Sequence, residues 1–157
     1  MSDCTNFASQ VAYVGGVSMK KHPEFKYNPY AADLDYDRDN NYWYSDWHNS
    51  TLVVLSYTWV QVENFRNYMK NSRKADVFTY SQTNADWKKL MQRAWIGDVV
   101  QCGNSHSILI EYVNSKDENG IKYAAHSKNA NDREFSNFKR WCKSEHPNDN
   151  IYLISFK

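Results

Sequence analysis

Apolar residues recur at helical spacing in the first half of the chain. Residues 4–14 predict an amphipathic helix, for which Asp3 is a suitable N-cap and a glycine pair is a suitable end. A second amphipathic helix is predicted over residues 59–71, with Thr58 as its cap. Its expected buried stripe is Trp59, Val62, Phe65 and Met69. Residues 84–91 predict a third, shorter helix.

The pattern changes from helical to alternating after Trp95. A turn followed by a strand is predicted over residues 96–102, and further strands over 106–113, 121–126 and 151–156, with a hairpin turn at 117–120 and a helix near 133–143. Helices therefore come first along the chain and an antiparallel sheet follows. That order predicts the α+β fold class.

Residues 20–50 show neither period and are expected to be irregular. They are rich in Asn, Asp and aromatic residues, among them Trp43 and Tyr44. An ordered connection of this length is usually functional or shields a site. We therefore expect Trp43, Tyr44 and Trp59 to line a substrate groove, although Trp43 and Trp59 would also fit a core.

Length and charge narrow the class of protein. The chain has 157 residues and a net charge of +1, which suits one domain and argues against nucleic acid as the main partner. No apolar run reaches the length of a membrane span. The first residues lack the features of a signal peptide, so we expect either that the protein is not exported by that route or that this chain is a domain of a longer one.

Cys4 is the candidate nucleophile. It lies in the first turn of the predicted helix, where free N–H groups and the helix dipole stabilise a thiolate. The alternative is that Cys4 is a buried, unreactive cysteine. Cys102 and Cys142 are expected to be structural, and three cysteines leave at least one free thiol.

Two histidines are placed to assist that thiol. His106 opens one predicted strand and His126 closes its hairpin partner, so the hairpin should bring them together. A thiol nucleophile needs a base, and the base needs an orienting group. We therefore predict Cys4 as nucleophile, His106 as base and His126 as orienting group. His22, His48 and His146 are expected to be surface residues.

A zinc site is the alternative for the same three side chains, because Cys and His are zinc ligands. No fourth ligand and no His-Glu-x-x-His spacing is visible in the sequence. We therefore predict no metal and no cofactor.

Several segments resemble the putative amidase domain family. The most specific is the opening block over residues 3–16, DCTNFASQVAYVGG. Further matches follow in order at 56–59 (SYTW), 97–101 (GDVVQ), 106–107 (HS) and 123–133 (YAAHSKNANDR). The notable departure is that almost no sequence precedes the cysteine block here.

The resemblance implies a relationship to the papain-like peptidoglycan hydrolases of the NlpC/P60 and CHAP type. It implies one papain-like domain over residues 1–157 and a catalytic triad of Cys4, His106 and His126, with Asn129 or Asn131 as alternatives for the third member. The Cys4 N–H would contribute to an oxyanion hole.

The implied activity is that of a monomeric cysteine amidase or endopeptidase that cleaves the peptide part of peptidoglycan and is secreted or associated with the cell wall. Two other functions stay open. One is a toxin-like cysteine protease or deamidase that acts on a protein. The other is a catalytically inactive module that binds wall peptides.

Overall fold

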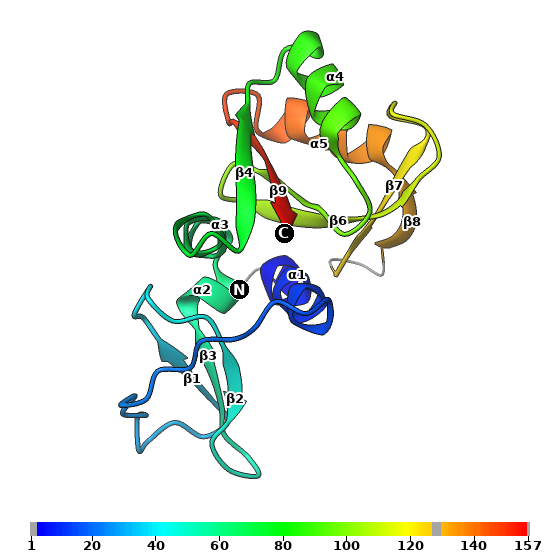
Figure 1. Cartoon of the computed structure of the whole chain (residues 1–157). Coiled ribbons are helices and arrows are strands. Elements are labelled where there is room, and N and C mark those ends of the chain that lie inside the picture. The colour runs from blue at the N-terminus through cyan, green and yellow to red at the C-terminus, as the bar shows by residue number, and fades with distance from the viewer. Residues whose placement is uncertain (1–2, 127–129, 157) are drawn as a thin grey trace.

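The computed structural model describes residues 3–126 and 130–156 (Figure 1). Helices and strands alternate irregularly along the chain. The elements are α1 (Asp3–Val14), β1 (Leu34–Asp37), β2 (Ser45–Trp47), β3 (Val53–Ser56), α2 (Tyr57–Val60), α3 (Val62–Asn71), β4 (Ala75–Tyr80), α4 (Asn84–Arg93), β5 (Val99–Cys102), β6 (His106–Val113), β7 (Ile121–Ala125), β8 (Ala130–Glu134), α5 (Phe135–Glu145) and β9 (Ile151–Phe156). The mixture of helices with largely antiparallel sheets confirms the α+β class.

The larger sheet has six strands in the order β4-β9-β5-β6-β7-β8, and every neighbouring pair is antiparallel. Its centre is the most buried part of the sheet, because all four residues of β5 are buried. The turn before β5 uses Gly97 at a φ of 92°, which a residue with a side chain adopts at a cost. This turn aligns β5 with β6.

The smaller sheet has three strands in the order β1-β3-β2 and lies apart from the larger one (Figure 1). β3 pairs in parallel with β1 and antiparallel with β2. Two of its strands lie within residues 20–50, the region that the sequence predicted to be irregular. That prediction was wrong there because both strands are short and gain their pairing from β3.

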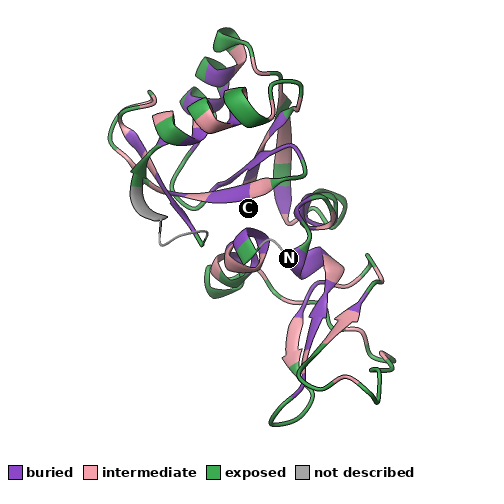
Figure 2. Cartoon of the chain, turned by 180° about the vertical axis from the view of Figure 1, so that it is seen from behind, coloured by how far each residue is buried: buried purple, intermediate pink, exposed green. Residues whose placement is uncertain are grey.

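Helices cover both faces of the large sheet (Figure 1). α4 and α5 pack on one face around a core that includes Trp87, Phe135 and Phe138. α1, α2 and α3 lie on the other face, between the two sheets, around a second core that includes Trp43, Trp59 and Phe65. Figure 2 shows buried segments along the strands of the large sheet and on the helices that lie against it.

The predicted helices are largely confirmed. α1 ends as expected at the glycine pair, where Gly16 has a φ of 102°. The helix predicted over 59–71 is instead two helices, because Gln61 adopts an extended conformation with a ψ of 132° between them. Thr58 therefore lies within α2 and does not cap a longer helix.

The four residues of the predicted stripe, Trp59, Val62, Phe65 and Met69, are all buried. Near the C-terminus the helix expected from about residue 133 begins at Phe135, because residues 130–134 pair with β7 as strand β8. β3 and β4 were not predicted at all. No helix among the described residues is both long and apolar enough to cross a membrane.

Candidate functional site

Cys4 lies in the first turn of α1, as predicted, and is only 2% exposed. The main-chain N–H of Ser107, in β6, donates a hydrogen bond to its Sγ at 3.3 Å. The Thr5 hydroxyl oxygen lies 3.9 Å from the same sulfur. The sulfur therefore has a main-chain donor and a neighbouring hydroxyl that can also donate, and donors to sulfur favour a thiolate over a thiol.

His126 reaches the same turn of α1 from the far end of β7. Its Nδ1 contacts the carboxylate of Asp3, and its ring stacks on Phe7 with the ring centroids 6.0 Å apart. Asp3 and Phe7 are four residues apart and so lie on one face of the helix. The carboxylate engages one ring nitrogen, which leaves Nε2 for other partners.

His106 lies on the other face of the sheet. Its ring packs against α5, with centroids 5.5 Å from Trp141 and 6.5 Å from Phe138. The neighbouring side chain, Ser107, faces α1, because successive side chains of a strand point to opposite faces. The structure therefore brings His126, and not His106, to the turn that carries Cys4.

A buried polar chain runs from Thr5 into the centre of the molecule. The Thr5 and Ser107 hydroxyl oxygens are 3.3 Å apart, and Gln101 Nε2 donates to Ser107 Oγ at 3.1 Å. Arg66 Nη1, from α3, donates to Gln101 Oε1 at 3.0 Å. All four residues are at most 6% exposed. Buried polar groups of this kind are costly unless each is satisfied, so the chain holds its members in defined orientations.

Arg66 is fixed by contacts on every side. Its guanidinium also donates to Gly103 O and to Asn104 Oδ1 and lies over the ring of Tyr152, 3.8 Å from its centroid. Burial lowers the pKa of Arg66, while Tyr152 and Glu63 act in the opposite direction. A guanidinium nevertheless keeps its proton at neutral pH, so this end of the chain stays positive.

The other two cysteines lie in the core, and both are fully buried. Burial raises the pKa of Cys142, and its hydrogen bond with Cys102 acts in the same direction. Cys142 therefore stays a protonated thiol at neutral pH, the form that does not attack a carbonyl.

Of the three aromatic residues expected in a groove, Trp43 and Trp59 lie in the core. They are 0% and 2% exposed, and their ring centroids are 4.8 Å apart. The Ser9 hydroxyl donates to Trp59 O and accepts from Trp43 Nε1, which ties both to α1. The structure assigns them a packing role between the two sheets and not a place on a groove.

Tyr44 also has little exposure but does border a cavity of about 300 Å³, which lies beside the small sheet. Its hydroxyl donates to Asp37 Oδ2 at 2.9 Å, and burial, followed by the interactions with Asp37, raises the pKa of Tyr44 well above its ordinary value. His22, which was expected to be a simple surface residue, places Nδ1 3.0 Å from the same oxygen.

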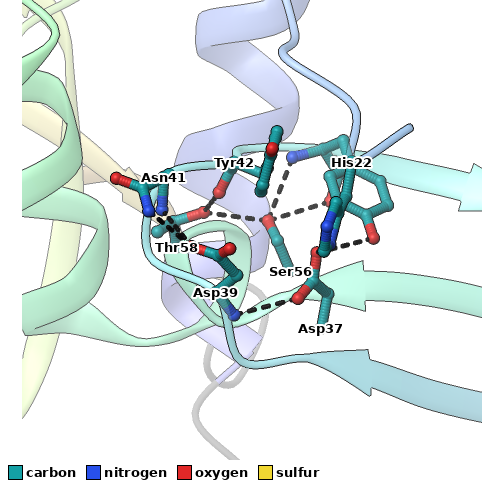
Figure 3. A network of polar contacts seen from close by, with 8 residues as sticks. His22, Asp37, Asp39, Asn41, Tyr42, Ser56 and Thr58 are labelled. Carbon is teal, nitrogen blue, oxygen red and sulfur yellow. Dashed lines mark hydrogen bonds and ion pairs between the residues drawn. The ribbon is translucent and has the colours of Figure 1, made fainter. Parts of the chain in front are cut away.

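Figure 3 shows that this Asp37 cluster continues through Ser56 and Thr58, which bond the backbone of Tyr44 and Tyr42. Most of residues 20–50 lack a helical or strand period, and the hydrogen bonds of this cluster hold them in a defined conformation. The sequence signal for this cluster was the pair Asp37 and Asp39, which are two positions apart and have polar neighbours.

Two asparagines were predicted as alternatives for the third catalytic position. Asn129 lies outside the described residues, and Asn131 belongs to β8. In the described part of the chain no group of three or more His, Cys, Asp or Glu side chains could hold a metal ion.

A shallow apolar hollow runs along the exposed face of α1. It has a volume of about 420 Å³ and is lined by Phe7, Gln10, Val11, Val14 and Gly15. Because Phe7 also stacks on His126, the hollow begins beside the turn that holds Asp3 and Cys4. An extended ligand lying there would pass the His126 ring.

Comparison with known proteins identifies the class to which this fold and site belong. A family described as Putative amidase domain matches residues 1–154. The chain belongs to this family, whose description points to hydrolysis of an amide bond. Neither the curated proteins nor the solved structures that were compared gave a match.

Proposed function

We propose that the chain is a cysteine-dependent amide hydrolase with Cys4 as its nucleophile. The observation that carries the proposal is the surroundings of its sulfur, at the N-terminal turn of α1 with the Ser107 N–H directed at it. Helix N-termini and hydrogen-bond donors both favour the thiolate, which is the nucleophilic form.

We assign the base to His126 and its orientation to Asp3. His106, which the sequence favoured as the base, packs against α5, whereas His126 touches the turn that holds Cys4. A carboxylate on Nδ1 fixes the tautomer in which Nε2 accepts a proton, the role of the third member of a triad.

The reaction then has two halves. His126 takes the thiol proton, Sγ bonds to the amide carbon, and the carbon–nitrogen bond breaks as the amine leaves with that proton. Water, deprotonated by His126, hydrolyses the thioester and restores the thiol. The Cys4 main-chain N–H is proposed as one donor to the oxyanion.

The substrate that we propose is the peptide part of bacterial peptidoglycan. The support is the resemblance of residues 3–16 and of the two His segments to wall hydrolases, together with the apolar hollow along α1 where an extended peptide could lie. On the same grounds we propose one papain-like domain over residues 1–157 that acts as a monomer at the cell wall.

The test compares the unaltered chain with Cys4→Ala on purified peptidoglycan, with products identified by mass spectrometry. We expect new free amines from the unaltered chain and none from Cys4→Ala, at an almost unchanged melting temperature. Cys102→Ala is the control for loss of a thiol and should retain hydrolysis while it remains folded. Equal product release by the unaltered chain and Cys4→Ala would refute the cysteine mechanism.

The low exposure of Cys4 supports a second candidate, an inactive module that binds wall peptides. Reaction with iodoacetamide at neutral pH separates the two. Fast alkylation confined to Cys4 supports the hydrolase, because an activated thiolate must be reachable. Alkylation no faster than that of a denatured control, combined with retention on insoluble wall, supports the binding module.

A further inference from the structure

The buried chain between Arg66 and Cys4 has a defined hydrogen-bond direction. A guanidinium has only donors, so the Gln101 oxygen must be the atom that faces Arg66. The Gln101 amide nitrogen then donates to Val62 O, which can only accept, and to Ser107 Oγ. Both ends of this amide are therefore assigned by partners whose own roles are fixed.

The direction continues to the sulfur. Because the Ser107 oxygen accepts from Gln101, its hydroxyl hydrogen is available for Thr5 Oγ1, 3.3 Å away. Thr5 then accepts from Ser107, and its own hydrogen is available for Cys4 Sγ, 3.9 Å away. The geometry therefore allows an arrangement in which each hydroxyl accepts from the Arg66 side and donates toward Cys4.

We propose that Arg66, Gln101, Ser107 and Thr5 form a one-way hydrogen-bond relay that presents a donor to Cys4 and so stabilises its thiolate. These four are positioning residues, since none of them except Thr5 contacts the sulfur through its side chain. The relay rests on the proposed role of Cys4 and deepens it. Hydrogen-bond chains strengthen each member, and hydrogen bonds to a charged group are the stronger kind.

Other charged groups near the sulfur affect its ionisation and must be held constant. Asp3 lies at the start of α1 and contacts His126, and Glu63 accepts from Asn104 at the Arg66 end. The experiment therefore alters uncharged relay members first, so that all these charges stay the same between proteins.

The first test is the ionisation midpoint of Cys4, measured from the ultraviolet absorbance of its thiolate against pH, with Cys4→Ala subtracted. Thr5→Val removes the last donor without changing size, and Thr5→Ser retains it. We expect Thr5→Val to raise the midpoint by about one pH unit, which is roughly ten-fold less thiolate at neutral pH, and Thr5→Ser to restore it. Coincident midpoints for all three proteins would overturn the relay.

The second test breaks the relay at its centre without adding a charge. Ser107→Ala removes the hydroxyl between Gln101 and Thr5 and keeps the main-chain N–H that donates to Cys4 Sγ. The midpoint should rise as in Thr5→Val, whereas Ser105→Ala, at an exposed position, should leave it unchanged. An unchanged midpoint in Ser107→Ala would overturn the relay, and Gln101→Leu gives the same reading if Ser107→Ala does not fold.

These results are independent of the hydrolysis assay. A raised midpoint in Thr5→Val supports the relay even where Cys4→Ala still hydrolyses wall, an outcome that would refute only the proposed function. An unchanged midpoint refutes the relay even where Cys4 proves essential.

Discussion

Cys4 lies in the first turn of α1, and His126, from a distant part of the chain, contacts the same turn. Asp3 and Phe7 hold the His126 ring from that turn, while Ser107 donates to the neighbouring sulfur from β6. The chemistry of the site therefore depends on contacts between α1 and the end of the hairpin formed by β6 and β7. Single substitutions can distinguish the roles of His126 and His106.

His126→Ala should lower hydrolysis by about 10²–10⁴-fold, the usual contribution of a general base. His106→Ala should retain the rate of each folded molecule, because its ring only packs against Phe138 and Trp141. Hydrolysis rates at matched folded concentration, checked by circular dichroism, measure the difference. A larger loss in His106→Ala than in His126→Ala would contradict the assignment.

Asp98 makes a second prediction, on stability. This carboxylate is 5% exposed and accepts from the Trp95 N–H at 2.8 Å. Burial raises its pKa above the ordinary value, against the opposing effects of the Trp95 and Ser155 hydrogen bonds and of Lys116. Between the unfolded and the folded pKa the native state binds more protons, so the free energy of unfolding contributed by this group falls as pH rises.

Asp98→Asn removes that titration. Urea unfolding across the acidic range should show a weaker decline of stability with rising pH than in the unaltered chain. Asp33→Asn, at an exposed position, should leave the pH dependence unchanged. Parallel curves for the unaltered chain and Asp98→Asn would show that the carboxylate is not the cause.

At this scale the sequence was sufficient to place Cys4 at a helix start but not to show which histidine contacts the same turn. The strand itself contained the relevant signal. His106 lies on the same face of β6 as Ile108 and Ile110, which are core residues, whereas Ser107 lies on the opposite face. Which face of a strand meets α1 depends on contacts between distant residues, and the local pattern does not contain them. The sequence did not predict the hydrogen-bond chain from Arg66 to Thr5, because that chain also depends on contacts between distant residues.

The elements with strong local signals match their predictions. α1, α4 and β6 have caps, periodic apolar positions or alternation within their own residues. The errors concern β3, β4 and the break at Gln61, whose conformations depend on pairing and packing with other parts of the chain. Of the three aromatic residues predicted to line a groove, Trp43 and Trp59 proved to be core residues, because the prediction rested on composition and not on contacts.

The N-cap of α4 allows a prediction at the scale of the element. Thr83 has an extended backbone, and its hydroxyl accepts from the Asp86 N–H at 3.2 Å. Thr83→Ala should lower the free energy of unfolding by about 1 kcal/mol, because that N–H loses its partner. Thr83→Ser retains the acceptor and should lose much less, as measured by urea unfolding. Equal losses would mean that the cap contributes little.

The whole molecule is organised around helices shared between two sheets. α1, α2 and α3 pack against the large sheet on one side and carry Trp43 and Leu55 of the small-sheet region on the other (Figure 1). Ser9 joins Trp43 and Trp59 within this layer. The small sheet therefore depends on α1, whereas the centre of the large sheet is covered by helices on both faces.

This arrangement predicts a gradient of local stability. Amides of β5, which is buried throughout, should exchange with solvent most slowly, and those of residues 20–33 should exchange fastest among the described segments between α1 and α3. Hydrogen exchange followed by mass spectrometry of peptides provides the measurement. Slower exchange in residues 20–33 than in β5 would contradict the described layering.

The central claim is that an acyl group of the substrate is transferred to the Cys4 sulfur. The direct measurement is acid quenching during turnover of a peptidoglycan stem peptide, followed by peptide mapping with mass spectrometry. The account predicts an acyl adduct on the peptide that contains Cys4 and none on the peptides that contain Cys102 or Cys142. Continued hydrolysis with no adduct on Cys4, and with Cys4→Ala equally active, would contradict it.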